Sequence, residues 1–106
     1  MNEPSRVFLY AEFQVSIPFD KGVWGEANPA MHTVPGLLNK TWLSGINNHT
    51  VGGFYEFDSV EHARAYAEGM LVDFAKAANG SLTVKLFDGD VVAEASKGMH
   101  SPYFIA

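Results

Sequence analysis

The sequence predicts an α+β fold, a ferredoxin-like βαββαβ arrangement whose four-stranded antiparallel sheet carries both helices on one face. Three observations lead to this prediction. Four stretches alternate apolar and polar residues, as strands do, and one long stretch repeats apolar residues at helical spacing. The order strand, helix, strand, strand, helix, strand is that of the split βαβ unit. A chain of 106 residues suits one domain, so we expect residues 1–106 to fold as a unit.

The first strand is predicted over Arg6–Val15, where apolar residues alternate with a mixed set. Pro18 ends it, because proline lacks the backbone donor that a central strand needs. Asp20 is a suitable cap for a following helix, in which Val23, Trp24 and Ala27 recur at helical spacing. Glycines and Pro29 lie within this stretch, so a weak, kinked helix is expected.

A hairpin is predicted next. Val34–Gly36 is a turn, Leu37–Leu43 a strand, Ser44–Thr50 a polar loop and Val51–Phe57 the antiparallel partner strand. Simple alternation along the first hairpin strand points Asn39 and Thr41 toward the helices. It points Lys40 and Trp42 away from them. The pair Gly52-Gly53 at the start of the second strand indicates a bend and close packing, with close approach of a ligand as the alternative.

The clearest element is a helix after Asp58, which with Glu61 forms a capping box. A single apolar stripe follows at spacings of three and four, formed by Val60, Ala63, Ala67, Met70, Leu71, Phe74 and Ala78. Asn79-Gly80 is typical of a helix end, and Leu82–Phe87 is predicted as the fourth strand. The tail contains Tyr103, Phe104 and Ile105, which a small domain would bury poorly, so we expect it to dock, plausibly on a second subunit.

One face of the predicted sheet mixes aromatic with charged side chains. These are Tyr10, Glu12, Gln14, Lys40, Trp42, Phe54, Glu56, Lys85 and Phe87. Such a face is too apolar for water and too polar for a core, whereas a second copy stacked on it would let the two acids pair with the two lysines. We therefore expect a homodimer, with Glu12 and Glu56 more plausible as partners of the lysines than as a catalytic pair.

Composition narrows the classes of function. The formal net charge is −5 and no cluster of Lys or Arg is present, which argues against nucleic-acid binding. No apolar run approaches the ~20 residues of a spanning helix, and the N-terminus lacks the layout of a signal peptide, so we expect a cytoplasmic protein that does not bind membranes. The chain has no cysteine, which excludes disulfides and thiol chemistry.

The residues between Val34 and Asp88 resemble a known family. The spaced block Lys40-x-Trp42, then Asn48-His49-x-x-Gly52-Gly53-x-Tyr55-x-Phe57, is similar to the YdhR-like "putative monooxygenases" of the dimeric α+β barrel superfamily. Pro35-Gly36, Ala65-Tyr66 and Lys85-Leu86-Phe87-Asp88 extend the resemblance. The first third of the chain and the tail depart from the family pattern.

The resemblance implies two sheets packed as a barrel, with a small-molecule pocket between helices and sheet in each subunit. It also implies a cofactor-independent monooxygenase of a small aromatic, quinol or polyketide-like substrate, which itself supplies the electrons to oxygen. Two alternatives stay open: an isomerase or cyclase of the same superfamily, and a non-catalytic small-molecule-binding protein.

Within this reading, His49 is the predicted catalytic base, because histidine exchanges protons near neutral pH, although Asn-His is also a reasonable turn sequence. Asn39 and Trp42 are predicted to position the substrate. Asn39 could instead hydrogen bond the first helix, and Trp42 could serve packing or the dimer contact.

Five further residues are candidates for substrate binding. Thr41 resembles Asn39 in its position, while Tyr55 and Tyr66 would orient a carbonyl or phenol or else be amphipathic core residues. Trp24 and His32 lie in the region expected to roof the pocket. The four histidines are scattered without the spacing of a metal site, and no phosphate loop is present, so neither a metal nor a cofactor is predicted.

Overall fold

The computed structural model describes residues 4, 6–14, 21–77 and 81–104. Its four strands are β1 (Val7–Gln14), β2 (Leu37–Ser44), β3 (Thr50–Phe57) and β4 (Leu82–Asp88). They form one sheet in the order β2-β3-β1-β4, and each neighbouring pair is antiparallel. This is the predicted ferredoxin-like α+β class.

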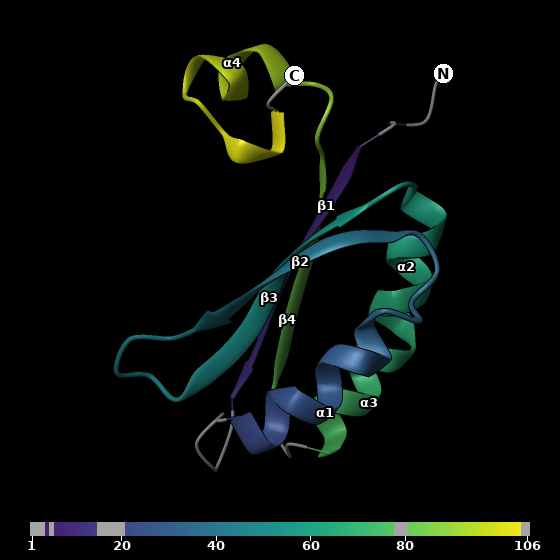
Figure 1. Cartoon of the computed structure of the whole chain (residues 1–106), viewed down its shortest axis with the longest axis vertical. Helices are drawn as coiled ribbons and strands as arrows, with labels where there is room; N and C mark the ends of the chain where they lie inside the picture. Colours follow the sequence, from purple (N-terminus) through teal and green to yellow (C-terminus); the bar gives the residue numbers. More distant parts are fainter. Residues whose placement is uncertain (1–3, 5, 15–20, 78–80, 105–106) are drawn as a thin grey trace.

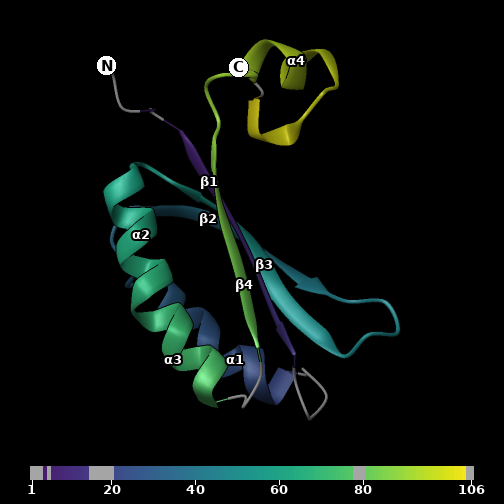
Figure 2. The ribbon, with the colours of Figure 1, turned by 180° about the vertical axis from the view of Figure 1, so that it is seen from behind.

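Three helices cover one face of the sheet, which we call the inner face; the opposite side is the open face (Figures 1 and 2). They are α1 (Lys21–Met31), α2 (Val60–Glu68) and α3 (Met70–Ala77). A short helix, α4 (Ala93–Gly98), and the 3-10 turn η1 (Pro102–Phe104) lie beyond one end of the sheet, near the start of β1. The predicted Asp20 cap and the Asn79-Gly80 helix end lie outside the described residues.

The single helix expected after Asp58 is two helices, because the chain breaks at Gly69, whose φ of −112° and ψ of −97° are not helical. The predicted cap is also displaced by one residue. Ser59 is the N-cap of α2, with extended backbone, and its hydroxyl accepts a hydrogen bond from the His62 backbone N–H at 3.1 Å. Asp58 instead contacts the His62 ring, at 2.6 Å between Oδ1 and Nδ1.

The core lies between the inner face and the helices. Val7, Leu9 and Ala11 of β1 and Tyr55 and Phe57 of β3 are almost completely buried, and they meet Ala63, Tyr66 and Leu71 of the helices. Leu82 and Leu86 of β4 pack at the edge of this cluster. Alternation along β1, β3 and β4 therefore matches the predicted faces.

The faces of β2 are reversed relative to the prediction. The pairing of β2 with β3 shifts between Leu37 and Asn39: Leu37 pairs with Phe57 and Asn39 already pairs with Glu56. Such a bulge adds one residue, here Leu38, and every later side chain points to the opposite face. Lys40 and Trp42 consequently lie on the inner face, against α1, whereas Asn39 and Thr41 lie on the open face.

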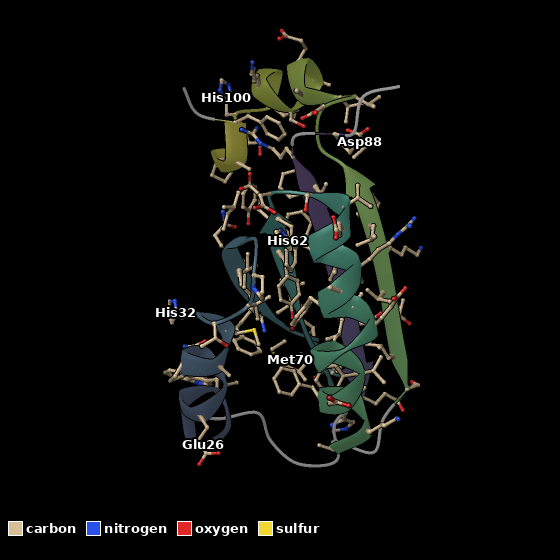
Figure 3. The ribbon with its side chains drawn as sticks, turned by 90° about the vertical axis from the view of Figure 1, so that its right-hand side faces the viewer. Glu26, His32, His62, Met70, Asp88 and His100 are labelled. Atoms are coloured by element: carbon tan, nitrogen blue, oxygen red, sulfur yellow. The ribbon has the colours of Figure 1, made fainter. Side chains whose placement is uncertain are left out.

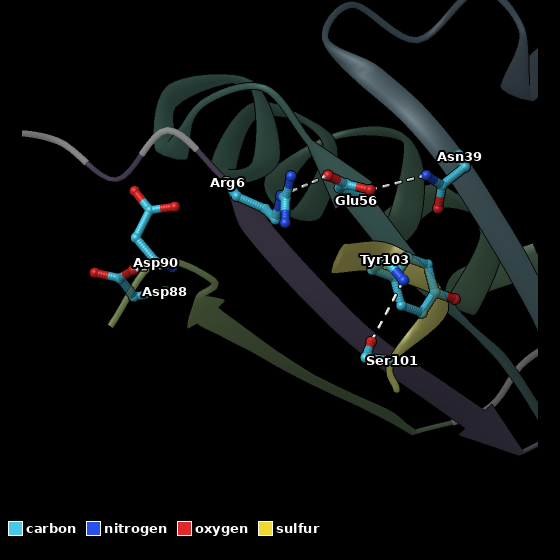
Figure 4. Close-up of polar contacts among 7 residues, drawn as sticks. All are labelled: Arg6, Asn39, Glu56, Asp88, Asp90, Ser101 and Tyr103. Atoms are coloured by element: carbon cyan, nitrogen blue, oxygen red, sulfur yellow. Dashed lines mark hydrogen bonds and ion pairs between the residues drawn. The ribbon is translucent and has the colours of Figure 1, made fainter. Parts of the chain in front are cut away.

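The open face carries a small polar network (Figure 4). Asn39 Nδ2 donates to Glu56 Oε1 at 2.9 Å, and Arg6 Nε lies 3.2 Å from Glu56 Oε2. The predicted pairing of Glu56 with a lysine is therefore wrong for Lys40, which lies on the other side of the sheet. Glu56 is only 8% exposed, and the cost of burying its carboxylate is offset by the neutral amide of Asn39 and the cationic guanidinium of Arg6.

The tail docks on the open face of its own sheet. The Tyr103 ring lies 5.4 Å from the Phe8 ring and 5.5 Å from the Phe54 ring, and Phe104 lies 5.9 Å from Phe8. The Tyr103 hydroxyl is 3.0 Å from Thr41 Oγ1. The tail thus covers β1 and β3 at one end of this face, while Phe87, which pairs with Phe8, and Lys85 on the neighbouring β4 stay exposed. Ile105 lies outside the described residues.

Among the described residues, no helix has both the length and the apolar character required to cross a membrane.

Candidate functional site

The amine of Lys40 is enclosed by two aromatic rings on the inner face. Its Nζ lies 3.2 Å from the centroid of the Trp42 ring and 4.7 Å from that of Tyr55. The third contact is with Sδ of Met31, at 3.5 Å. A thioether is a weak acceptor, and no carboxylate of the described residues lies within ion-pair distance of Nζ. A cationic lysine is therefore poorly compensated at this position.

Gly53 provides the space for this lysine. A Cβ atom on Gly53 would lie 2.8 Å from Lys40 Cε and 3.0 Å from the Tyr55 ring, closer than such atoms approach one another. Gly52, its neighbour, faces the other side, where a Cβ would collide with the carbonyl oxygen of Ala11 on β1. The two glycines therefore have different structural roles: Gly52 lets the strands pack closely, and Gly53 makes room for Lys40.

A pair of tyrosines extends the cluster toward α2. The hydroxyl groups of Tyr55 and Tyr66 are 2.9 Å apart, and Tyr66 Oη donates to Met31 Sδ at 3.7 Å. Both rings are almost fully buried. Met31 thus receives two donors, one from Lys40 and one from Tyr66, and connects the end of α1 to the sheet and to α2.

Helix α1 lies over the cluster and is tied to it by a second contact. Trp42 Nε1 donates to Asn28 Oδ1 at 2.8 Å. The helix contains Pro29 and has neither an acidic residue in its first turn nor a basic one in its last, so tertiary contacts such as these contribute much of its stability. Lys40 and Trp42 both keep part of their surface exposed, so the cluster is not sealed from solvent.

Burial sets the protonation states here. It lowers the pKa of Lys40 from 10.5 to about 7, because an ammonium loses hydration among apolar groups. Burial also raises the pKa of Tyr66 to about 12, and it raises the pKa of Tyr55 still further, with the neighbouring Tyr66 adding to the effect. At neutral pH the two phenols are therefore protonated, while the Lys40 amine is divided between its charged and neutral forms.

The structure brings together three of the predicted site residues: Trp42, Tyr55 and Tyr66. Two others, Asn39 and Thr41, lie on the opposite side of the sheet, because the β2 bulge reverses the direction of the side chains that follow it. Their predicted orientation toward the helices is therefore wrong.

The remaining candidates lie outside the cluster. His49 is exposed in the turn between β2 and β3, with a positive φ of 55°. His32 follows α1 and is exposed, and its side chain points away from the space between α1 and α2 (Figure 3). Trp24, on α1, is 37% exposed. No group of three or more potential metal ligands occurs within the described ranges.

Sequence reasoning missed Lys40, Asn28 and Met31 as members of the site. Lys40 stands in the Lys-x-Trp block, which is a usable signal, but strict alternation placed it on the wrong face. Asn28 and Met31 lie four and seven residues after Trp24, so helical spacing from that residue would have found them.

Comparison with known proteins agrees with this architecture. The family model described as "Putative mono-oxygenase ydhR" matches residues 8–102. The search of curated proteins gave no match. The N63A mutant of SnoaB, "a cofactor-independent oxygenase from Streptomyces nogalater", superposes with a TM-score of 0.57 at 17% identity, covering 78% of this chain and 91% of that chain.

A second solved structure, described as "a putative monooxygenase from Shewanella loihica PV-4", gives a TM-score of 0.54 at 18% identity over 81% of this chain and 95% of that chain. At these identities the two structures establish the fold. The family model spans nearly the whole domain, including the strand with Lys40 and Trp42, and the chain therefore belongs to the family described as "Putative mono-oxygenase ydhR".

Proposed function

We propose that the protein is a homodimeric, cofactor-independent mono-oxygenase of a small aromatic, quinol or polyketide-like compound, which binds between α1 and the inner face of the sheet. Family membership and the similarity to SnoaB support the reaction class. The observation that carries the location is the cluster of Trp42, Tyr55 and Tyr66, whose apolar rings surround a few polar groups, as is typical of small-molecule sites.

The reaction balances without a cofactor. When a phenol is converted to a quinone, one atom of O₂ becomes the second carbonyl oxygen and the other leaves as water. The substrate loses all four electrons that the oxygen molecule gains. The protein therefore needs to bind the ring, accept its acidic proton and keep competing water away from it. Trp42 offers a ring for stacking, and Tyr55 and Tyr66 are protonated donors at neutral pH.

The second subunit is proposed to cover what remains of the open face. Phe87 and Lys85 are exposed there, and Glu12 on β1 is only partly buried. Stacking the same face of another copy would bury the aromatic ring and bring opposite charges close.

Oxygen uptake with a panel of phenols and naphthols tests the proposal, because their conversion to quinones requires an oxygen atom from O₂. We expect uptake with one O₂ consumed for each quinone formed, and a loss of at least tenfold in Trp42→Ala. His49→Ala separates the two candidate regions: the exposed turn predicts unchanged uptake, whereas a catalytic His49 predicts a loss. Consumption of a lactone or polyketide equally fast without air, or binding with no product, would contradict the oxygenase and favour the isomerase or the binding protein.

A further inference from the structure

We propose that Lys40 is the proton acceptor of this site and that the site takes weakly acidic phenols or enols, which it holds as anions against the Lys40 ammonium. The proposal rests on the proposed function for its place in catalysis. The step is a single proton transfer: the substrate O–H breaks, the proton joins the neutral Nζ, and the electron pair stays on the substrate oxygen.

No carboxylate of the described residues pairs with the Lys40 amine. A buried lysine is normally paired with a carboxylate, yet Nζ meets two ring faces and a sulfur, and no acid of the described residues reaches it. The ring faces of Trp42 and Tyr55 attract a cation but do not neutralise it. An anionic ligand oxygen would supply both the missing charge and a strong acceptor.

The groups around Nζ carry no second charge. Tyr55 of β3 contacts Nζ with its ring, and Tyr66 of α2 is hydrogen bonded to Tyr55; both hydroxyls stay protonated. From α1, the uncharged Met31 contacts Nζ and the uncharged Asn28 is hydrogen bonded to Trp42. The inner face of β1 contributes apolar residues of the core. Lys40 is thus the group of this cluster that changes charge near pH 7.

The charged side chains of these helices that the structure describes do not face the amine. Glu26 and His32 of the α1 region are exposed and point away from the interior (Figure 3). His62 of α2 is occupied by Asp58. Further charged residues of α2 and α3 are solvent-exposed, namely Glu61, Arg64, Glu68, Asp73 and Lys76.

An amine of this kind also suits the chemistry. A general base works best when its pKa lies near the operating pH, and burial brings Lys40 there. His49, the base predicted from sequence, lies in an exposed turn. The missing Cβ of Gly53 leaves room for the Lys40 side chain beside the Tyr55 ring, since a Cβ would come to 2.8 Å from Lys40 Cε and 3.0 Å from that ring.

The substrate class follows from the same geometry. A phenol or enol whose pKa is not far above that of Lys40 transfers its proton readily, and its oxygen can meet Nζ among the aromatic rings of the cluster. An aliphatic alcohol holds its proton too tightly for this amine, and a carboxylic acid arrives already ionised. Acidic planar hydroxy-aromatics are therefore the expected ligands.

Anaerobic binding of 4-nitrophenol tests the proposal without turnover, because its phenolate is recognised by its visible absorption. We expect the wild type and Lys76→Met, an exposed control on α3, to bind the probe as phenolate even at pH 6. Lys40→Met should bind it at least tenfold more weakly and as the neutral phenol. Lys40→Arg, which keeps the charge but does not accept a proton, should bind the phenolate yet lose oxygen uptake.

A titration of the wild type keeps the test independent of any variant's folding. In lysine-selective NMR, one of the five lysines should titrate near pH 7, and its midpoint should rise when 4-nitrophenol saturates the protein. Neutral probe bound by the wild type, no binding of the probe, or phenolate bound equally well by Lys40→Met would overturn the proposal. Phenolate binding without oxygen uptake would instead overturn the proposed oxygenase function. Oxygen uptake retained by Lys40→Met would overturn only the role of Lys40 as proton acceptor.

Discussion

The backbone of Gly53 lies directly against the side chain of Lys40, and a Cβ atom added there would come to 2.8 Å from Lys40 Cε. This contact links the glycine pair of β3 to the site on the inner face. It also makes the two glycines experimentally separable, because Gly52 packs against the backbone of β1, whereas Gly53 packs against side chains, with the flexible Lys40 closest and the Tyr55 ring next.

The first prediction compares these glycines. In Gly53→Ala we expect the lysine to move and the backbone to stay, so the free energy of unfolding should fall by only about 1 kcal/mol, while the NMR midpoint of Lys40 rises toward its ordinary value. In Gly52→Ala the strands themselves must separate, which should cost roughly 3 kcal/mol or more. Urea unfolding and the lysine titration check both. Equal losses of stability with an unchanged Lys40 midpoint would show that Gly53 does not serve the lysine.

The second prediction concerns stability and pH. The pKa of Lys40 is about 7 in the folded protein and 10.5 in its unperturbed state. Between these values the unfolded chain binds more protons, so stability should rise with pH, by at most about 1.4 kcal/mol per unit. This rise in stability is expected only up to about pH 10. Above that pH the tyrosines of the unfolded chain ionise before the buried Tyr55 and Tyr66, whose pKa values are raised, and this lowers the stability of the folded protein.

Urea unfolding at pH 7, 8 and 9 measures this rise. Lys40→Met should flatten the profile and be more stable than the wild type at pH 7, because methionine buries no charge. Lys76→Met, an exposed change on α3, should keep the wild-type slope. Parallel profiles for the wild type and Lys40→Met would mean that Lys40 is hydrated in the folded protein.

The four strands show what the sequence can and cannot predict. Alternation located all four strands and the correct faces of β1, β3 and β4, since the pairing of β1 with β3 and with β4 runs without a register shift. It failed on β2, because one extra residue at Leu38 reverses every later side chain and nothing local announces it. The same reversal hid Lys40 from the predicted site and placed Asn39 in it.

Helical spacing had a similar limit. The apolar stripe after Asp58 runs through Gly69 without interruption, so the pattern predicts one helix although the backbone changes direction there. The capping box was misplaced by one residue because Asp58 and Ser59 are both good caps, and only the structure shows that Asp58 is engaged by His62. The docking of Tyr103 on its own sheet is a long-range contact that no local pattern encodes.

The third prediction tests the N-cap of α2. Ser59→Ala removes the acceptor of the His62 N–H and should lower the free energy of unfolding by about 0.5–2 kcal/mol. Ser81→Ala, an exposed serine just before β4, is the matched control and should change it little. Ser59→Asp restores an acceptor at the same place and should recover most of the loss. A loss equally large in Ser59→Asp would assign the effect to something other than capping.

The last prediction concerns the second subunit. The Tyr103 and Phe104 rings already cover Phe8 and Phe54, so a partner has to use the rest of the open face, where Phe87 is 48% exposed. Sedimentation at micromolar concentration should show a dimer for the wild type. Phe87→Asp places a charge in the proposed contact and should weaken association at least tenfold, because an unpaired carboxylate would lose its water there. His32→Asp, an exposed change on the helix side, should remain dimeric.

A wild-type monomer, or a Phe87→Asp protein that associates as tightly as the wild type, would show that the open face is not the interface. Because the Lys40 cluster is built from β2, β3, α1 and α2 of one chain, the site described above would remain intact in that case.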